Sequence, residues 1–300
     1  MSPWVYVAGK SFAGIVVTHD IFNMVESVRK SCARAEFDRF FNRSLIASAV
    51  ILLPLLYWRV KSIWVTDSLS LPSFQRRAYW NTGVIEFFSA LIIAAGFLWL
   101  LGISLELAGA YVVNPKLPDI GKALRSGIFI ALFIACMEEL LFRGVMLGLW
   151  LRFAKPLPAS IGCSLVFAFL HFLEPPKGTV IANPAAATAG FELLASIMRH
   201  FANPVFFITD FATLFVIGMI LCQARLRTGK LWFSIGLHTG WVFAYQGFNR
   251  MFKEVGDHWL HPFGVGDSLR SGTLPVFTLL LTAVVCHFVL KAIHRPVNPA

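Results

Sequence analysis

Residues 127–153 read GIFIALFIACMEELLFRGVMLGLWLRF. This apolar run exceeds the roughly 20 residues that a helix needs to cross a bilayer. Two adjacent glutamates and an arginine, Glu138, Glu139 and Arg143, nevertheless lie near its middle. Charged side chains inside a membrane span are rare, and they usually face a protein interior or a water-filled cavity. The stretch therefore predicts a membrane helix that carries functional polar groups.

The composition of the whole chain is that of a membrane protein. Of its 300 residues, 57% are hydrophobic and 14% are charged, whereas a soluble domain has about 25% charged residues. Apolar runs predict membrane spans near residues 45–60, 85–108, 123–152, 157–173, 205–223, 230–249 and 273–293. We expect an all-α polytopic membrane protein, a bundle of about seven or eight transmembrane helices with an intramembrane polar active site. The run 123–152 is long for one crossing, so we expect strong tilt, extension beyond the bilayer or a break near its charges.

Basic and aromatic residues alternate ahead of the first long apolar run. They predict an amphipathic segment over residues 1–44 that lies on an anionic membrane surface, followed by a helical membrane domain over 45–300. The net charge of +10 fits Lys and Arg at helix ends and in cytoplasmic loops. No nucleic-acid recognition motif accompanies it, so nucleic acid is not an expected partner. We expect a multi-pass protein of a bacterial inner membrane with its N-terminus in the cytoplasm. The stretch GFELLASIMRHF at 190–201 predicts a short interfacial helix.

Helix geometry separates the two glutamates. Glu139 and Arg143 are four residues apart, so they share a helix face and can form an ion pair. Glu138 points about 100° away from Glu139, because an α-helix has 3.6 residues per turn. We therefore expect Arg143 to neutralise Glu139 and Glu138 to face a cavity. A carboxylate in such a place suits a general base or a metal ligand.

Two histidines lie on later apolar runs, each near a turn or a basic end. His171 ends the stretch FAFLH at 167–171 and shares a face with Phe167. His238 ends SIGLH at 234–238, with Ser234 one turn before it as an expected partner. Two glycines, Gly236 and Gly240, flank His238 and would let the backbone of another helix approach closely. Either histidine alone is more often a hydrogen-bonded packing residue than a ligand.

Together the glutamates, the arginine and the histidines predict one polar pocket inside the membrane. Carboxylate and imidazole groups match the ligand preferences of zinc and could activate water for amide hydrolysis. A divalent metal, most simply zinc, would be held by Glu138, His171 and His238. The sequence contains neither the HExxH of the common zinc proteases nor the GxSxG of serine hydrolases.

EELLFR at 138–143, FAFLH at 167–171 and SIGLH at 234–238 resemble three motifs of the CPBP family. That family comprises the CAAX prenyl endopeptidases of the second type and their bacterial relatives, the Abi proteins. The resemblance covers a core of about residues 120–250 and implies an intramembrane endopeptidase that acts on membrane-embedded or lipid-anchored peptides.

The resemblance also implies a role for each matched residue. Glu138 would activate water, and Glu139 with Arg143 would support it. Phe167 would shape the site. His171 and His238 would bind metal or stabilise the oxyanion. The resemblance leaves open whether a bound divalent metal or the glutamate alone activates the water.

One position departs from the family pattern. Val242 stands four residues after His238, where the family has Asn or Asp. Losing an oxyanion-binding amide typically costs about 10²–10³ in rate, and Asp210 or His287 could supply the missing group from another helix. Two alternatives therefore stay open: a catalytically weak or inactive scaffold or bacteriocin-immunity-type protein of the same fold, and a proton-coupled transporter with a Glu and His relay.

Overall fold

The structure, a computed structural model, describes residues 76–115, 119–172, 181–200, 210–256, 258–261, 263–266 and 268–294. The predicted N-terminal segment 1–44 and the first predicted span, 45–60, lie outside these residues. The chain divides into two compact units, one formed by Met1–Arg59 with His171–Pro204 and the other by Val60–Leu170 with Val205–Ala300. We describe each unit by itself.

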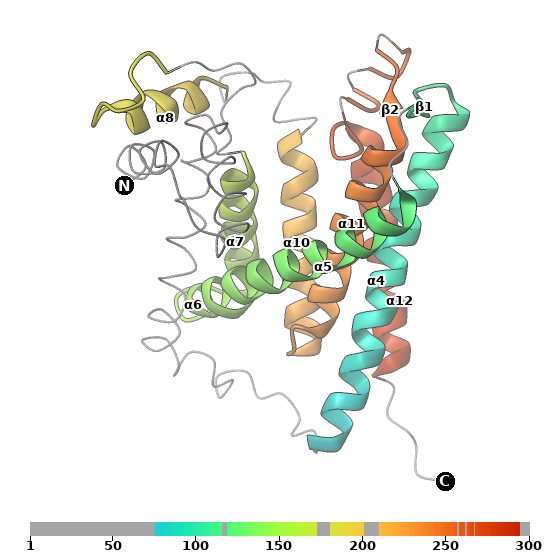
Figure 1. The fold of residues 1–300 in the computed structure, drawn as a ribbon. Helices are drawn as coiled ribbons and strands as arrows, with labels where there is room; N and C mark the ends of the chain where they lie inside the picture. Colours follow the sequence, from blue (N-terminus) through green and yellow to red (C-terminus); the bar gives the residue numbers. More distant parts are fainter. Residues whose placement is uncertain are drawn as a thin grey trace, which may run out of the picture. The chain divides into compact units, whose positions relative to one another are not determined.

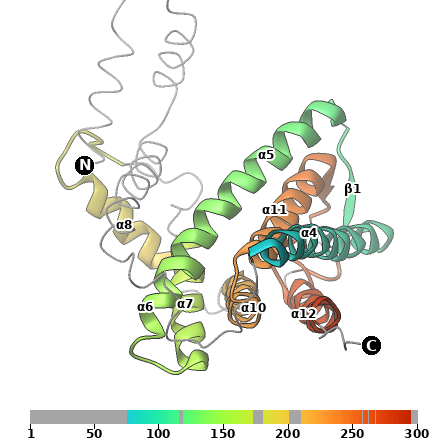
Figure 2. The ribbon, with the colours of Figure 1, turned by 90° about the horizontal axis from the view of Figure 1, so that it is seen from below.

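The larger unit is a set of packed helices. It contains α4 (Arg76–Leu107), α5 (Ile120–Glu139), the π-helix η2 (Leu140–Met146), α6 (Leu147–Trp150), nearly all of α7 (Pro156–His171), α10 (Ala212–Thr228), α11 (Trp232–Met251) and α12 (Thr273–Ile293). α11 lies along α4 and is crossed by α5, while α12 contacts both α4 and α10 (Figures 1 and 2). The side chains shared by α4, α10, α11 and α12 form the main apolar core.

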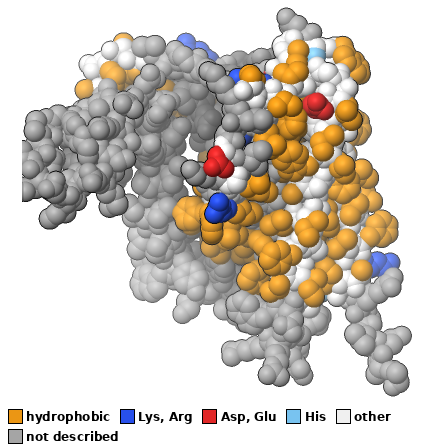
Figure 3. Space-filling model, turned by 45° about the vertical axis from the view of Figure 1, so that its right-hand side comes forward, with side chains coloured by type: hydrophobic (Ala, Val, Ile, Leu, Met, Phe, Trp, Pro, Cys, Tyr) orange, Lys and Arg blue, Asp and Glu red, His pale blue; other side chains and the backbone are white. Residues whose placement is uncertain are grey.

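The described part of the chain is mostly helical and contains apolar helices, which confirms this part of the all-α prediction. Among the residues that the structure describes, Thr82–Leu107 and Thr273–Ile293 are long and apolar enough to cross a membrane, and Pro156–His171 is a shorter apolar helix. Their outward side chains are hydrophobic, as Ile92 on α4 and Phe277 on α12 illustrate. In Figure 3, the described part of the visible face carries mostly hydrophobic side chains and few charges. The predicted number of seven or eight spans stays a prediction.

The long predicted run 123–152 is helical throughout the charged region. α5 leads directly into η2 and then into α6, and the π-helical segment starts at the residue after Glu139. In η2 the backbone N–H of Leu147 donates to the carbonyl of Phe142, five residues earlier. Such π-helical turns inside α-helices occur frequently at functional sites. The expected break is thus a local widening of the helix that leaves the chain helical.

Two glycines of α11 allow a close approach to α4, as the sequence predicted. A Cβ atom at Gly240 would lie 2.5 Å from the backbone oxygen of Leu91, and one at Gly236 would collide with the backbone oxygen of Phe87. Only the absence of a side chain permits backbones to pack at this distance. Since His238 lies between these glycines, the contact sets how closely α4 approaches the part of α11 that carries the histidine.

A two-stranded ribbon joins the distant ends of α4 and α11. β1 (Tyr111–Val113) pairs antiparallel with β2 (Phe252–Glu254), with Val112 opposite Lys253. The sequence analysis did not predict these strands, because three residues are too few to show a period of two. Their pairing also joins segments that are about 140 residues apart in the chain.

In the smaller unit the structure describes α8 (Ala189–His200). The predicted helix within GFELLASIMRHF is therefore present. Leu193 and Ile197 are buried, whereas Phe191 and Leu194 are exposed. This division into two faces is the pattern of an amphipathic helix, and the interfacial location stays a prediction.

Candidate active site

A buried ion pair lies at the start of η2. Nη1 of Arg143 donates to Oε1 of Glu139 at 2.9 Å, and both side chains are almost fully excluded from solvent. Nη2 of Arg143 donates to the backbone oxygen of Gly218 on α10 at 3.2 Å. The pair expected from the four-residue spacing is present. The bond to Gly218 ties it to a second helix.

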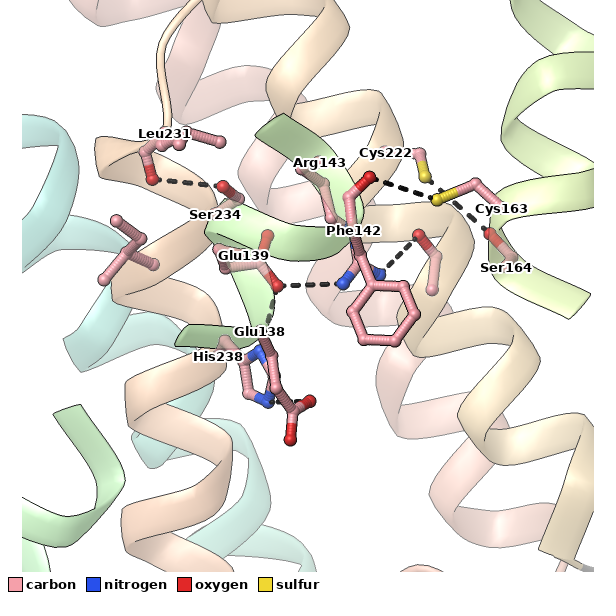
Figure 4. Close-up of polar contacts among 12 residues, drawn as sticks. Glu138, Glu139, Phe142, Arg143, Cys163, Ser164, Cys222, Leu231, Ser234 and His238 are labelled. Atoms are coloured by element: carbon pink, nitrogen blue, oxygen red, sulfur yellow. Dashed lines mark hydrogen bonds and ion pairs between the residues drawn. The ribbon is translucent and has the colours of Figure 1, made fainter. Parts of the chain in front are cut away.

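His238 of α11 contacts both glutamates. Its Nδ1 lies 2.9 Å from the Glu139 oxygen that also accepts from Arg143, and its Nε2 lies 3.7 Å from Oε2 of Glu138 (Figure 4). A carboxylate accepts hydrogen bonds, so the short contact places the imidazole proton on Nδ1. The lone pair of Nε2 then faces Glu138.

The two neighbouring carboxylates have opposite environments. The side chain of Glu139 is completely buried, while that of Glu138 is 27% exposed. A charge is tolerated at the buried position because Arg143 balances it and hydrogen bonds hold it. Glu138 is the carboxylate that an incoming molecule can reach. Its Oε2, the oxygen nearest to Nε2 of His238, is buried, so the exposed part of Glu138 lies elsewhere on its side chain.

Aromatic rings enclose the ion pair. The guanidinium carbon of Arg143 lies 4.4 Å from the ring centroid of Phe167, which α7 contributes. That ring also packs edge-on against Phe142, at 5.1 Å, and against the imidazole of His238, at 6.1 Å. A cation over an aromatic face within about 6 Å is attracted to it. Phe167 thus contacts Arg143 and His238 at once, and it is itself buried.

Sulfur and hydroxyl groups surround the outer side of η2. The thiol of Cys163 on α7 donates to the carbonyl of Phe142 at 3.4 Å, and Ser164 lies 3.8 Å from the sulfur of Cys222 on α10 (Figure 4). Gly218 permits this packing, because a Cβ there would lie 2.8 Å from that of Ser164. α7 and α10 are therefore held against the turn that presents Arg143.

His171 is the sixth predicted site residue. It is the last residue of α7, is half-buried, and belongs to the smaller compact unit. The geometry above is therefore that of Glu138, Glu139, Arg143, Phe167 and His238. Within the described part of the chain, no group of three or more His, Cys, Asp or Glu side chains could hold a metal ion. The structure places two of the three predicted zinc ligands, Glu138 and His238, beside each other.

Three expected partners have other contacts. Ser234 donates to the carbonyl of Leu231 at 3.0 Å. The imidazole of His238 is instead held by Glu139. Hydroxyl groups inside helices often bond to their own backbone in this way. Asp210 accepts a hydrogen bond from Ser271, and His287 contacts Arg227 on an exposed face. Neither of these contacts joins the site near Val242, which is half-buried.

Two features of the site have no strong sequence signal. The bond from His238 to Glu139 cannot be read from helix spacing, because spacing separates the two glutamates without saying which one faces α11. The acceptor at Gly218 is a backbone oxygen, a group that every residue has. Its only sequence signal is a glycine within an apolar run, which allows a close helix contact.

Comparison with known proteins agrees with the motifs. A family model described as "Type II CAAX prenyl endopeptidase Rce1-like" matches residues 121–244, a segment that contains all three motifs. No curated protein and no solved structure matches the chain. The segment 121–244, which holds Glu138, Glu139, Arg143, Phe167, His171 and His238, is thus similar to the Rce1-like type II CAAX prenyl endopeptidases.

Proposed function

We propose that this protein is an intramembrane endopeptidase that hydrolyses peptide bonds of membrane-embedded or lipid-anchored substrates. The observation that carries the proposal is the arrangement around His238. One ring nitrogen is held by the buried pair of Glu139 and Arg143, and the other lies 3.7 Å from the accessible carboxylate of Glu138. The family match supports protease activity of the CAAX type.

The spacing of Glu138 and His238 suits the activation of water. An oxygen about 2.8 Å from both Oε2 and Nε2 fits geometrically, since these atoms are 3.7 Å apart. Glu138 would take one proton while the oxygen attacks the peptide carbonyl carbon, forming a tetrahedral oxyanion. The proton would then pass through Nε2 of His238 to the amine nitrogen as the C–N bond breaks. The products are a carboxylic acid and an amine, so one water molecule is consumed.

Glu139 would stabilise the charge that His238 acquires during this transfer. Its carboxylate oxygen contacts Nδ1 at 2.9 Å, and burial strengthens such an electrostatic contact. Arg143 keeps that carboxylate ionised by supplying a balancing charge at the same distance. Phe167 fixes the orientation of both groups through its ring contacts.

Zinc remains a separate proposal. A catalytic zinc site normally has three protein ligands, so His171 would have to join Glu138 and His238. If bound there, the ion would lower the pKa of a coordinated water molecule. Metal analysis of purified wild-type protein and of His171→Ala and His238→Ala tests this directly. Zinc content that is unchanged in both variants excludes these ligands.

We also propose that the apolar helices belong to a multi-pass bundle of seven or eight spans. The hydrophobic outer faces of α4 and α12 support it. The cytoplasmic N-terminus rests on the basic N-terminal segment of the sequence, and the bacterial inner membrane rests on the resemblance to the bacterial Abi proteins. Labelling of single introduced cysteines from either side of the membrane would test the topology.

The decisive experiment replaces Glu138 with Gln. Purified protein in liposomes is incubated with an internally quenched prenylated CAAX peptide and with a transmembrane peptide, and new termini are identified by mass spectrometry. We expect Glu138→Gln to lower kcat by at least about 10³-fold, in the range of general-base and charge effects combined. The matched control, Glu106→Gln at the end of α4, should retain the wild-type rate. Equal rates in wild type and Glu138→Gln would refute the catalytic role.

A further inference from the structure

A second buried group of ionisable side chains lies where three helical elements meet. Glu86 of α4 is fully buried, and its Oε1 lies 3.9 Å from Nζ of Lys230 and 3.2 Å from Nε2 of His294. Nζ of Lys230 also donates to the hydroxyl of Thr82 at 2.9 Å. Lys230 belongs to the turn between α10 and α11, and His294 follows α12.

The group is balanced when one positive charge faces one negative charge. Lys230 supplies the cation and Glu86 the anion, while a neutral His294 adds no charge to the group. Buried ionised groups are tolerated only when they are paired. The side chain of Lys230 is 7% exposed and that of Glu86 is 0% exposed. If one partner is removed, water can therefore do little to solvate the charge of the other.

This group continues into the contact that holds His238. Beyond Lys230, α11 begins at Trp232, and its residues Gly236 and Gly240 pack against backbone oxygens of α4 on either side of the histidine. His238 is eight residues beyond Lys230, about 12 Å at 1.5 Å per residue. The ion pair therefore lies at one end of the same α4 and α11 interface that has His238 at its middle.

We propose that Glu86 and Lys230 are positioning residues whose ion pair sets the position of α11 along α4, and thereby the distance between His238 and Glu138. The proposal rests on the proposed endopeptidase function. The glycine contacts set how closely the two helices approach, and the ion pair adds a charged contact between two particular residues at the end of the interface. A displacement of 1 Å at a reacting group can cost about 10²-fold in rate. The 3.7 Å separation at the active site would change with any such displacement.

The test is a double-mutant cycle with kcat and KM measured on the folded, monodisperse fraction. Glu86→Gln removes the charge that balances Lys230, and Lys230→Met does the reverse. We expect each single change to lower kcat at least about tenfold with KM within about twofold. The double variant has no charge to balance and should recover to within about threefold of wild type. Lys230→Arg, which keeps the charge, should recover most of the activity, and Lys253→Met on the exposed face of β2 is the matched control.

Several results would overturn the proposal. They are wild-type kcat in both single variants, losses that multiply in the double variant, or losses confined to the yield of folded protein. If a single variant is not recovered in folded form, the double variant decides, because pairing requires it to be folded and active. Failure of the endopeptidase function is distinguished by Glu138→Gln: if that variant abolishes cleavage while Glu86→Gln does not affect it, only the positioning role is wrong.

Discussion

Replacing Arg143 with Met should separate the stability of this fold from its activity. Met has a similar length and keeps part of the packing on Phe167, but it removes both hydrogen bonds of the guanidinium. The carboxylate of Glu139 would remain completely buried without its cation. Breaking a buried pair by removing one partner costs about 3–5 kcal/mol. We expect a loss of unfolding free energy of that size, together with loss of peptide cleavage.

The double variant Arg143→Met with Glu139→Gln makes the prediction specific. It leaves no buried charge, and replacing a whole buried pair by neutral groups is often close to neutral for stability. We therefore expect it to regain most of the lost stability, to within about 1–2 kcal/mol of wild type. Activity should stay low, because the charge that stabilises a protonated His238 is absent. Stability would thus recover in the double variant, whereas activity would stay low in both variants.

The assay is reversible unfolding in mixed detergent micelles, followed by circular dichroism, alongside cleavage of the quenched peptide. Arg152→Met, which changes an exposed arginine beyond α6, is the control for the loss of one charge. The reasoning is refuted if Arg143→Met costs less than about 1 kcal/mol, a value typical of an exposed pair. It is equally refuted if the double variant is no more stable than the single one. Full recovery of activity in the double variant would remove Glu139 from the mechanism.

Gly240→Ala should lower both stability and kcat, because its Cβ would lie 2.5 Å from a backbone oxygen of α4. The control is Gly96→Ala, whose Cβ would have no atom within 4 Å. This control should be neutral or slightly stabilising in thermal unfolding. Val242→Asn should raise kcat at least about tenfold by adding an amide one turn from His238, and an unchanged rate would mean that another group binds the oxyanion. His294→Gln should make stability less sensitive to acid. Burial, and then the charge of Lys230, lower the pKa of His294, so the folded state disfavours its protonation and wild-type stability falls as pH drops below about 6.5. Melting temperatures at pH 5 and pH 8 should differ less in the variant than in wild type.

Much of the helical framework could be predicted from the sequence, because helix positions follow from uninterrupted apolar runs with turn signals between them. The predicted span 273–293 coincides with α12, and 230–249 differs from α11 by two residues at each end. Gly229 adopts a left-handed conformation with φ of 66° and ends α10, as a glycine after a helix often does. The pairing of Glu139 with Arg143 was also predictable, since it depends on helix spacing alone.

The contacts between distant segments were not predictable in the same way. Glu86 and Lys230 are separated by more than 140 residues, and nothing in either apolar run indicates which helix the other will contact. The isolated charge at Glu86 in a predicted span was a usable signal, because intramembrane charges require partners. It indicated that a partner exists without identifying Lys230 or His294. The same limit applies to His238, whose nearest carboxylate could be assigned only from the structure.

The contrast between Glu138 and Glu139 explains how one imidazole can connect a closed site with an open one. Consecutive residues on a helix point in different directions, so one carboxylate lies among Arg143 and α10 while its neighbour stays accessible. His238 lies between them and uses a different nitrogen for each. The buried side fixes the proton on Nδ1, which leaves Nε2 free to accept a proton only on the accessible side. In the proposed mechanism the buried pair would therefore act on the reaction through the imidazole, without contact with the substrate. This is why neutralising the pair should preserve the fold and still abolish cleavage.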